Sequence, residues 1–441
     1  PIYYDPQTEY RPWVEADGSE MDPADPASAL YNPDDSTVGN VNLTKEQSDV
    51  AFWYAGTAPS DGACFREFAG GPCISAELEY WPITFFEYKG TGDEDEQEAQ
   101  ESDNYYRYQI RKNKAYRLDL ATGAEIQITQ FTWDDTTRTI AQETQNFANW
   151  FQYHRSRVLS SRAGIGRAFT RMPDQARVGF AAINQGERKI DGVDSDQAVI
   201  TGVRNFGSGT VADDGRSRFY NTLYSRTIEG GTPLRSAANA VGEYFERDDA
   251  KAPWSTTPGD DDGEDLACRQ SFHILMSDGF WNGNTSPGVG NADDTTGLEI
   301  TGPDAGEGPQ SFTYSPVSPF SDSHSNTLAD VAMDYWKRDL RDDIENLVST
   351  TPDDPAFWQH LTSFGIGLGV EGNLNPDEVF DAIDTEANVI WPDPAPDNNG
   401  FRDNPGAAID DLLHFGVNGR GGFFSATDPA TFAQELGDLL L

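Results

Sequence analysis

The pattern of hydrophobic and polar residues changes near residue 139. Residues 1–138 show no helical periodicity and are rich in aromatic residues, prolines and acids. Within them, residues 77–89 and 104–120 show the short apolar runs that are typical of β-strands, and the acidic run between the two is predicted to be a hairpin loop or a disordered tip. We therefore predict that residues 1–138 are a β-rich insertion that decorates a core domain.

From residue 139 onward, apolar positions repeat with helical spacing. The apolar residues between 147 and 169 recur at steps of three, four or seven, which predicts one long helix that ends near Pro173. Beyond it, short apolar runs that predict strands alternate with amphipathic stretches that predict helices. The predicted strands are 177–183, 198–203, 272–276, 361–370 and 422–426, and the predicted helices are 217–228, 233–245, 328–340, 376–383, 407–417 and a closing helix from Asp428 that Thr427 caps.

Strands that alternate with helices are typical of a sheet with parallel strands and helices on both faces. We therefore predict an α/β fold for residues 139–441, with a doubly wound, mostly parallel sheet of the Rossmann type. Residues 282–325 are rich in Gly, Asp, Ser and Pro and are predicted to form a long loop on the ligand side of this sheet. No stretch approaches the roughly 20 apolar residues that a membrane span needs.

The strand predicted at residues 272–276 is followed at once by Ser277 and Asp278. Ligands of open α/β sheets bind at the carboxyl ends of the strands, so Asp278 is a candidate binding residue. Thr232 follows two glycines and precedes a predicted helix. A hydroxyl and a carboxylate are ligands that Mg²⁺ or Ca²⁺ accepts, with waters and a partner's carboxylate completing the shell. The alternative is that Thr232 caps the helix and Asp278 is a turn residue.

The charge of the chain limits the classes of partner that it can bind. The chain has 74 acidic and 31 basic side chains, a formal net charge of −43, so it repels nucleic acid and anionic lipid. Protein and glycan partners are not excluded.

Cys64 and Cys73 are close enough in sequence for a local disulfide. Cys268 would then be either a buried free thiol or the partner of a cysteine outside this chain.

Motifs of catalysis are absent from the sequence. There is no G-x-S-x-G elbow, no P-loop and no zinc spacing among the five histidines, so an enzyme is not expected. The acidic run 260–265 lacks the twelve-residue calcium loop and is interpreted as a solvated loop. His273 is interpreted as a core residue. Trp281 would either face a partner at the sheet edge or pack in the interior.

Longer matches connect the chain with a family. It resembles the N-terminal domain of PilY/PilC-type adhesins of type IV pili, and the order of Thr232 and Asp278 resembles two parts of the metal-ion-dependent adhesion site of von Willebrand factor A-like domains. The matching segments are 2–6, 145–151, 155–158, 230–235, 268–283, 328–340, 357–360, 418–421 and 424–429.

The resemblance implies a von Willebrand A-like fold and an extracellular protein at the pilus tip, exported through the periplasm. Such a protein takes part in surface or host adhesion and in pilus assembly or retraction, with minor pilins and a host or surface receptor as partners. The structural alternative is a metal-independent cap that docks onto minor pilins.

Two parts of the family pattern have no match. The family's first strand, with its aspartate-x-serine-x-serine metal motif, is expected before residue 1, and its β-propeller after residue 441, so we interpret the chain as a fragment. Asp17-Gly18-Ser19 resembles the metal motif superficially. Because no apolar strand precedes it, we interpret this similarity as a chance match and not as the metal motif.

Overall fold

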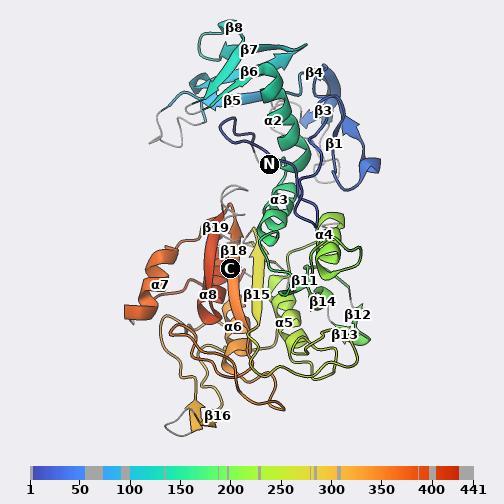
Figure 1. Cartoon of the computed structure of the whole chain (residues 1–441). Coiled ribbons are helices and arrows are strands. Elements are labelled where there is room, and N and C mark those ends of the chain that lie inside the picture. The colour runs from blue at the N-terminus through green and yellow to red at the C-terminus, as the bar shows by residue number, and fades with distance from the viewer. Residues whose placement is uncertain are drawn as a thin grey trace. The chain divides into compact units, whose positions relative to one another are not determined.

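The computed structural model describes residues 3–54, 73–90, 100–133, 136–186, 188–195, 198–226, 230–278, 280–282, 286–304, 309–385, 387–396 and 404–426 (Figure 1). The chain divides into two compact units. Unit 1 consists of Pro1–Val14 and Glu20–Ala163, and unit 2 consists of Glu15–Ser19 and Gly164–Leu441. The division predicted after residue 138 stays a prediction.

Unit 1 contains antiparallel strands and the helix α2 (Ile140–Tyr153). Strands β5 to β8 form a four-stranded sheet in sequence order, and the other strands pair two at a time. The strands are β1 (Ala29–Leu30), β2 (Asn40–Val41), β3 (Gln47–Tyr54), β4 (Cys73–Tyr80), β5 (Thr84–Tyr88), β6 (Tyr105–Arg111), β7 (Lys114–Asp119), β8 (Glu125–Ile128), β9 (Gln130–Trp133) and β10 (Thr136–Thr139). The described strands of this unit therefore all precede α2.

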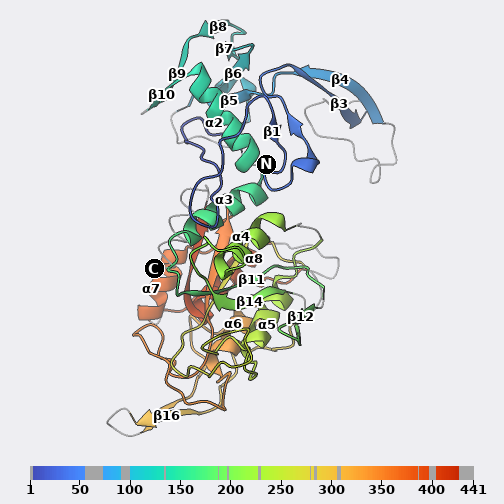
Figure 2. The same ribbon diagram turned by 45° about the vertical axis from the view of Figure 1, so that its right-hand side comes forward.

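Helix α2 binds the N-terminal segment through buried polar side chains, and the two run beside each other in Figures 1 and 2. Asn146 Oδ1 accepts from the backbone N–H of Tyr10 (2.8 Å), and Asn149 Nδ2 donates to the Tyr10 carbonyl (2.9 Å). The indole of Trp13 donates to the Tyr153 carbonyl (2.9 Å). An extended segment outside a sheet needs such partners for its buried backbone groups. The polar side chains of α2 therefore bond the backbone groups that a neighbouring strand would otherwise bond.

The single long helix predicted through residue 169 is wrong. The chain forms α2 and then α3 (Arg157–Phe169), separated at His154–Ser156. His154 leaves helical geometry with φ −137°, and its carbonyl accepts a hydrogen bond from the Ser160 hydroxyl (2.8 Å). A side chain thus takes up a carbonyl that a continuous helix would bond internally. Apolar spacing continues across this break, so the hydrophobic pattern alone does not reveal it.

Unit 2 contains short strands and helices in alternation. The strands are β11 (Arg177–Ala181), β12 (Arg188–Ile190), β13 (Val193–Ser195), β14 (Val199–Asn205), β15 (Phe272–Ser277), β16 (Ile300–Asp304), β17 (Pro309–Phe312), β18 (Thr362–Leu368) and β19 (Arg420–Ala426). The helices after α3 are α4 (Gly215–Ser225), α5 (Leu234–Phe245), α6 (Leu328–Lys337), α7 (Pro376–Thr385) and α8 (Ala407–Asn418). None of the described helices is long and apolar enough to cross a membrane.

The centre of unit 2 is a parallel sheet with the strand order β15-β18-β19. Helix α8 packs on β18 and β19, and α6 packs on α8, as the yellow-to-red ribbon of Figure 1 shows. A Cβ atom at Gly365 would collide with the Leu412 carbonyl, and one at Gly416 with the Gly422 carbonyl. Glycine at these two positions therefore lets the backbone of α8 approach the sheet closely.

The prediction of a doubly wound, mostly parallel sheet of the von Willebrand A type is wrong. Within the described residues only β15, β18 and β19 pair in parallel, and β11 pairs with β14 antiparallel in a separate two-stranded sheet. The segment between β11 and β14 contains the hairpin β12–β13 and no described helix. A parallel pairing needs a crossover connection, usually helical. The positions of the strands at 177–183 and 198–203 were thus predicted, but the parallel direction predicted for them is wrong.

Candidate functional site

The end of β15 carries the first predicted site residue. Strand β15 ends at Ser277, and Asp278 follows it with a half-buried side chain. Helix α5 begins at Leu234, with Pro233 in the N-cap position and no side-chain cap. Thr232 is therefore not the N-cap residue of α5, and the helix begins one residue later than the start predicted at Pro233.

Hydrogen bonds fasten the turn of Thr232 to the segment that follows Asp278. The backbone N–H of Thr232 donates to Asn282 Oδ1 (2.7 Å), and the backbone N–H of Asn282 donates to the Thr232 carbonyl (2.9 Å). Asn184 Nδ2 donates to the carbonyl of Gly231 (2.6 Å). These bonds bring the two predicted motifs to one place in unit 2. Asn282 and Asn184 were not predicted to do this, although Asn282 stands directly after Trp281.

The aromatic residues around this strand end belong to the core. Trp281 is buried, its indole donates to Asp411 Oδ2 (3.0 Å), and the Arg235 guanidinium lies 4.1 Å from its ring centroid. Of the two interpretations of Trp281, interior packing is therefore confirmed. His273 is buried with its ring edge against Phe415, and this burial lowers its pKa to about 4. The interpretation of His273 as a core residue is confirmed.

Buried carboxylates hold the first turn of α6. Asp411 accepts hydrogen bonds from the backbone N–H groups of Leu328 (3.1 Å) and Ala329 (3.2 Å), which have no partner within the helix. Burial nevertheless raises the pKa of Asp411 to about 7. Asp330 forms a capping box with Thr327 at the same helix end. Negative charge at a helix N-terminus is favourable, which is why acids are tolerated here in the interior.

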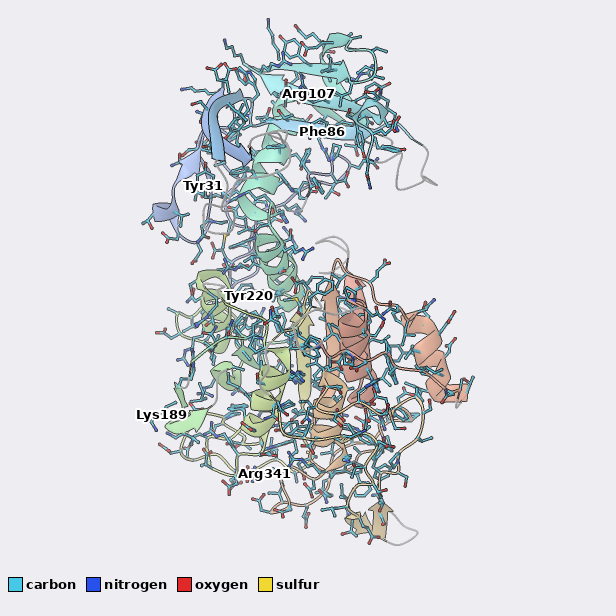
Figure 3. All side chains as sticks on the ribbon, turned by 180° about the vertical axis from the view of Figure 1, so that it is seen from behind. Tyr31, Phe86, Arg107, Lys189, Tyr220 and Arg341 are labelled. Atoms are coloured by element: carbon cyan, nitrogen blue, oxygen red, sulfur yellow. The ribbon has the colours of Figure 1, made fainter. Side chains whose placement is uncertain are left out.

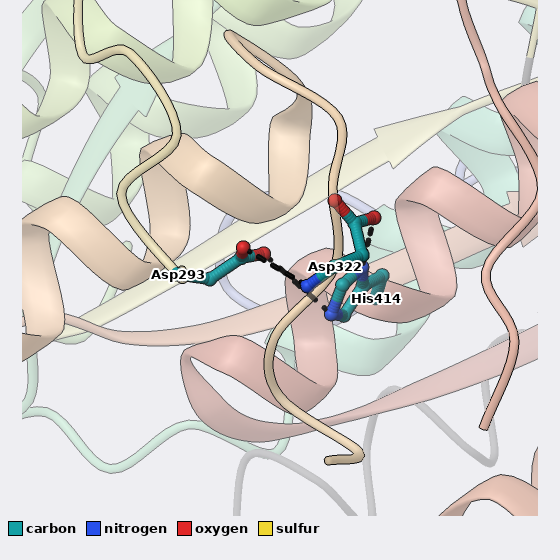
Figure 4. A group of neighbouring side chains, drawn as sticks. All are labelled: Asp293, Asp322 and His414. Atoms are coloured by element: carbon teal, nitrogen blue, oxygen red, sulfur yellow. Dashed lines mark hydrogen bonds and ion pairs between the residues drawn. The ribbon is translucent and has the colours of Figure 1, made fainter. Parts of the chain in front are cut away.

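Three more titratable side chains meet beside this helix end (Figure 4). Asp293 and Asp322 come from the segments before β16 and α6, and His414 comes from α8. One nitrogen or oxygen atom of each lies within 4.8 Å of the others. Asp293 accepts from the Asp322 backbone N–H (3.2 Å) and from Asn418 Nδ2 (3.0 Å). Burial, and then the carboxylates of Asp330 and Asp322, raise the pKa of Asp293 to about 8.

The imidazole of His414 is held on its face and on one edge. Its ring stacks on Trp391 with centroids 3.8 Å apart and an interplanar angle of 7°. Its Nε2 lies 2.8 Å from the Phe320 carbonyl, which can only accept, so Nε2 carries the proton. Burial lowers the pKa of His414 to about 3, so the ring is neutral at pH 7.

This group was not found from the sequence. Its members stand at positions 293, 322 and 414, so no local spacing relates them. The only signal was that the two aspartates of the group, Asp293 and Asp322, lie in residues 282–325, which were predicted to form a loop on the ligand side of the sheet.

Other acidic candidates form local structure. Asp17 Oδ1 accepts from both the backbone and the hydroxyl of Ser19, as in a tight turn, and Gly18 has φ +85°. In the acidic run 260–265, Asp265 binds the buried guanidinium of Arg341 at 2.6 Å, and Arg341 is labelled in Figure 3. That run thus contributes an ion pair, while Asp260 and Asp262 are exposed.

The predicted disulfide between Cys64 and Cys73 stays a prediction, because Cys64 lies outside the described residues; Cys73 is the first residue of β4. Among the described cysteines, Cys268 is a free thiol. It is exposed, whereas the sequence offered a buried thiol as one interpretation.

Three curated relatives match this chain. The protein named type IV pilus biogenesis factor PilY1 of Pseudomonas aeruginosa strain PAK is 33% identical over 324 residues, which are 68% of this chain and 26% of the relative. The proteins of the same name from strains PAO1 and UCBPP-PA14 are 30% identical over 358 residues and 29% identical over 329 residues. No family model and no solved structure matches.

The chain spans about a quarter of the length of these relatives, whereas the matched region covers more than two thirds of the chain itself. Identity near 30% over more than 300 residues, with the same name in all three, supports a relationship to the PilY-type family of type IV pilus biogenesis factors.

Proposed function

We propose that this chain is the head of a type IV pilus-associated factor that mediates adhesion to a host or other surface and contributes to pilus assembly or retraction. The observation that supports the proposal is the similarity to three pilus biogenesis factors over more than two thirds of the chain. The protein would act outside the cell at the pilus tip after export through the periplasm. It would bind minor pilins and a surface receptor, and it would have no catalytic activity.

Adhesion would depend on a Mg²⁺ or Ca²⁺ ion held by the Thr232 hydroxyl and the Asp278 carboxylate. Both are oxygen ligands of the kind that these ions prefer, and neither side chain is fully buried. Thr232 is not the N-cap residue of α5, so its hydroxyl is not needed for the start of that helix. Its bonds with Asn282 fix the position of the turn next to the strand end. A carboxylate of the receptor would complete the shell of the ion.

The Asp278→Ala variant of the full-length protein tests this role. We expect cation-dependent adhesion to fall to the level measured for wild type in EDTA, while pilus number is kept. Asp260→Ala is the matched control, since Asp260 is an exposed acid away from the strand end. Adhesion of Asp278→Ala cells that equals wild type and still responds to EDTA would contradict the cation role of Asp278.

A second candidate function is a cap that docks onto minor pilins without a metal ion. It is favoured by the hydrogen bonds between Thr232 and Asn282 and between Asn184 and Gly231, because protein groups alone then fasten the strand end. Co-purification with minor pilins in the presence of chelator separates the two functions. The cap predicts full recovery of the complex in EDTA and in the Asp278→Ala variant, whereas adhesion through a cation predicts an effect on receptor binding alone.

A further inference from the structure

The group of Asp293, Asp322 and His414 has a feature that its own hydrogen bonds leave unexplained. His414 Nε2 donates to the Phe320 carbonyl, so Nδ1 of the neutral ring carries a lone pair. This nitrogen lies 3.6 Å from Asp322 Oδ2. A lone pair and a carboxylate oxygen thus face each other, and neither of them is a donor when Asp322 is ionised. An arrangement of this kind is stabilised by a cation between the two atoms.

A second observation comes from the side chain of Asn418, which is fully buried and stands one helical turn after His414 on α8. Its Nδ2 donates to Asp293 Oδ2, and its amide also contacts His414. Its Oδ1 is buried and has no hydrogen-bond partner. A buried amide oxygen without a donor is costly. Because the amide adjoins both Asp293 and His414, this oxygen is available as a further ligand at the same place.

The charges of the surroundings also favour a bound cation. The carboxyl groups of Asp293 and Asp322 each have an oxygen within 4.8 Å of a His414 ring nitrogen, and Asp330 adds a third carboxyl group that accepts from the backbone N–H of Asp293. The ammonium group of the nearby Lys337 donates to the carbonyls of Ala292 and Thr295. Burial and mutual repulsion both oppose a negative charge on these two carboxyl groups, and a divalent cation between them would offset both effects.

We propose that Asp293, Asp322 and His414 form a binding site for a divalent cation of the zinc class, with Asn418 Oδ1 as the fourth ligand. Tetrahedral zinc with bonds of about 2.0–2.2 Å has its ligands about 3.3–3.5 Å apart. The separation of His414 Nδ1 from Asp322 Oδ2 is 3.6 Å, and one possible ligand atom of each of the three residues lies within 4.8 Å of the other two. Small side-chain movements therefore bring these groups into coordination distance.

The choice of zinc over Mg²⁺ or Ca²⁺ follows from the ligands. An imidazole nitrogen suits zinc and its neighbours in the transition series, whereas Ca²⁺ takes six to eight oxygen ligands and Mg²⁺ keeps several waters. The hydrogen bond from His414 Nε2 to Phe320 and the stacking on Trp391 orient the ring as a metal-binding histidine is usually oriented. The site is closed and lies apart from Thr232 and Asp278 in sequence, so its role would be structural. It would clamp the loop segments around Asp293 and Asp322 onto α8.

The test uses the purified 441-residue chain, with zinc as the probe after dialysis against chelator and then buffer. We expect one zinc ion per chain, a rise of several degrees in Tm, and visible absorption typical of four-coordinate cobalt when Co²⁺ replaces zinc. Asp293→Asn and Asp322→Asn keep the side-chain size and should each weaken zinc affinity by at least about 100-fold. Asp294→Asn is the matched control, because Asp294 is the exposed neighbour in the same loop.

Circular dichroism of the metal-free proteins shows whether each variant is folded. If Asp293→Asn does not fold, Asp322→Asn and the cobalt spectrum of the wild type still decide the question. An adventitious surface ion would bind equally to Asp293→Asn, Asp322→Asn and wild type and would leave Tm unchanged. That result, or a wild type that binds no zinc at micromolar concentration, would overturn the proposal.

Discussion

The strand end with Asp278 and the buried group around Asp293 lie in the same unit and both contain carboxylates, yet they differ in construction. At the strand end, two short local motifs meet, and two hydrogen bonds between Thr232 and Asn282 hold them together. The buried group takes Asp293, Asp322 and His414 from three separate segments. The first is half exposed, whereas Asp293 and His414 are almost completely buried. Replacing an acid at the strand end should therefore cost little stability, whereas replacing one in the buried group should destabilise the fold.

The largest expected effect on stability is that of Asp411→Ala. The Asp411 carboxylate accepts from Leu328, Ala329 and Trp281, so its loss leaves three buried donors without an acceptor. We expect the free energy of unfolding to fall by at least about 3 kcal/mol. Chemical denaturation of the variant and of the exposed control Asp260→Ala measures it. Equal midpoints for the two would show that Asp411 does not support the fold.

The next effect is a pH dependence from His273, which lies inside the strand that ends at Asp278. Its folded-state pKa of about 4 is below the ordinary value of 6.5, so the unfolded state binds the proton first. Its neutral form therefore supports the fold above pH 6.5, and this support is lost as the pH falls toward 4. At pH 5 the loss amounts to about 2 kcal/mol.

The measurement for His273 is a comparison of slopes. The raised pKa values of Asp293 and Asp411 act in the opposite direction, because the folded state then holds protons that the unfolded state has released. Unfolding free energies of wild type and His273→Gln between pH 4 and 6.5 should differ in slope by up to about one proton. Parallel curves would show that His273 titrates normally in the folded protein.

A smaller loss of stability is expected for Thr327→Ala, and it contrasts with the effect expected at Thr232, which also lies near the start of a helix. Thr327 caps α6, accepting from Asp330 N (3.0 Å) inside a capping box. Thr327→Ala should lower the free energy of unfolding by about 1–2 kcal/mol. Thermal unfolding provides the value. A neutral substitution would mean that the capping box does not contribute to α6.

The smallest stability effect is expected for Thr232→Ala, because Thr232 does not cap α5. We expect a change within about 0.5 kcal/mol, together with a large loss of cation-dependent adhesion in the full-length protein. A stability loss as large as that of Thr327→Ala, with adhesion kept, would restore the view that this hydroxyl has only a structural role.

The sequence predicted the elements of unit 2 better than their arrangement. Apolar runs located β15, β18 and β19, and amphipathic spacing located α5, α6, α7 and α8. Strand direction failed at β11 and β14, because it depends on whether the connection contains a helix, and the hairpin β12–β13 is too short and polar to be recognised. The break at His154 failed for a similar reason, since it depends on side-chain bonds rather than on periodicity.

The candidate sites divide in the same way. Thr232 and Asp278 were found because glycines and a strand end mark them locally, whereas Asn282 became visible only through its bond with Thr232. Asp293 and His414 carry no local mark. Their proximity is a consequence of tertiary packing, which brings the segment after β15 against α8.

The central claim is that the strand end and the buried group are separate cation sites of different chemistry. Calorimetric titration of the full-length protein with Zn²⁺ and with Mg²⁺ or Ca²⁺, for wild type, Asp278→Ala and Asp293→Asn, tests it most directly. We predict that Asp293→Asn loses zinc binding and keeps Mg²⁺ or Ca²⁺ binding, and that Asp278→Ala does the reverse. Loss of both cations in one variant, or of neither in both, would contradict the claim.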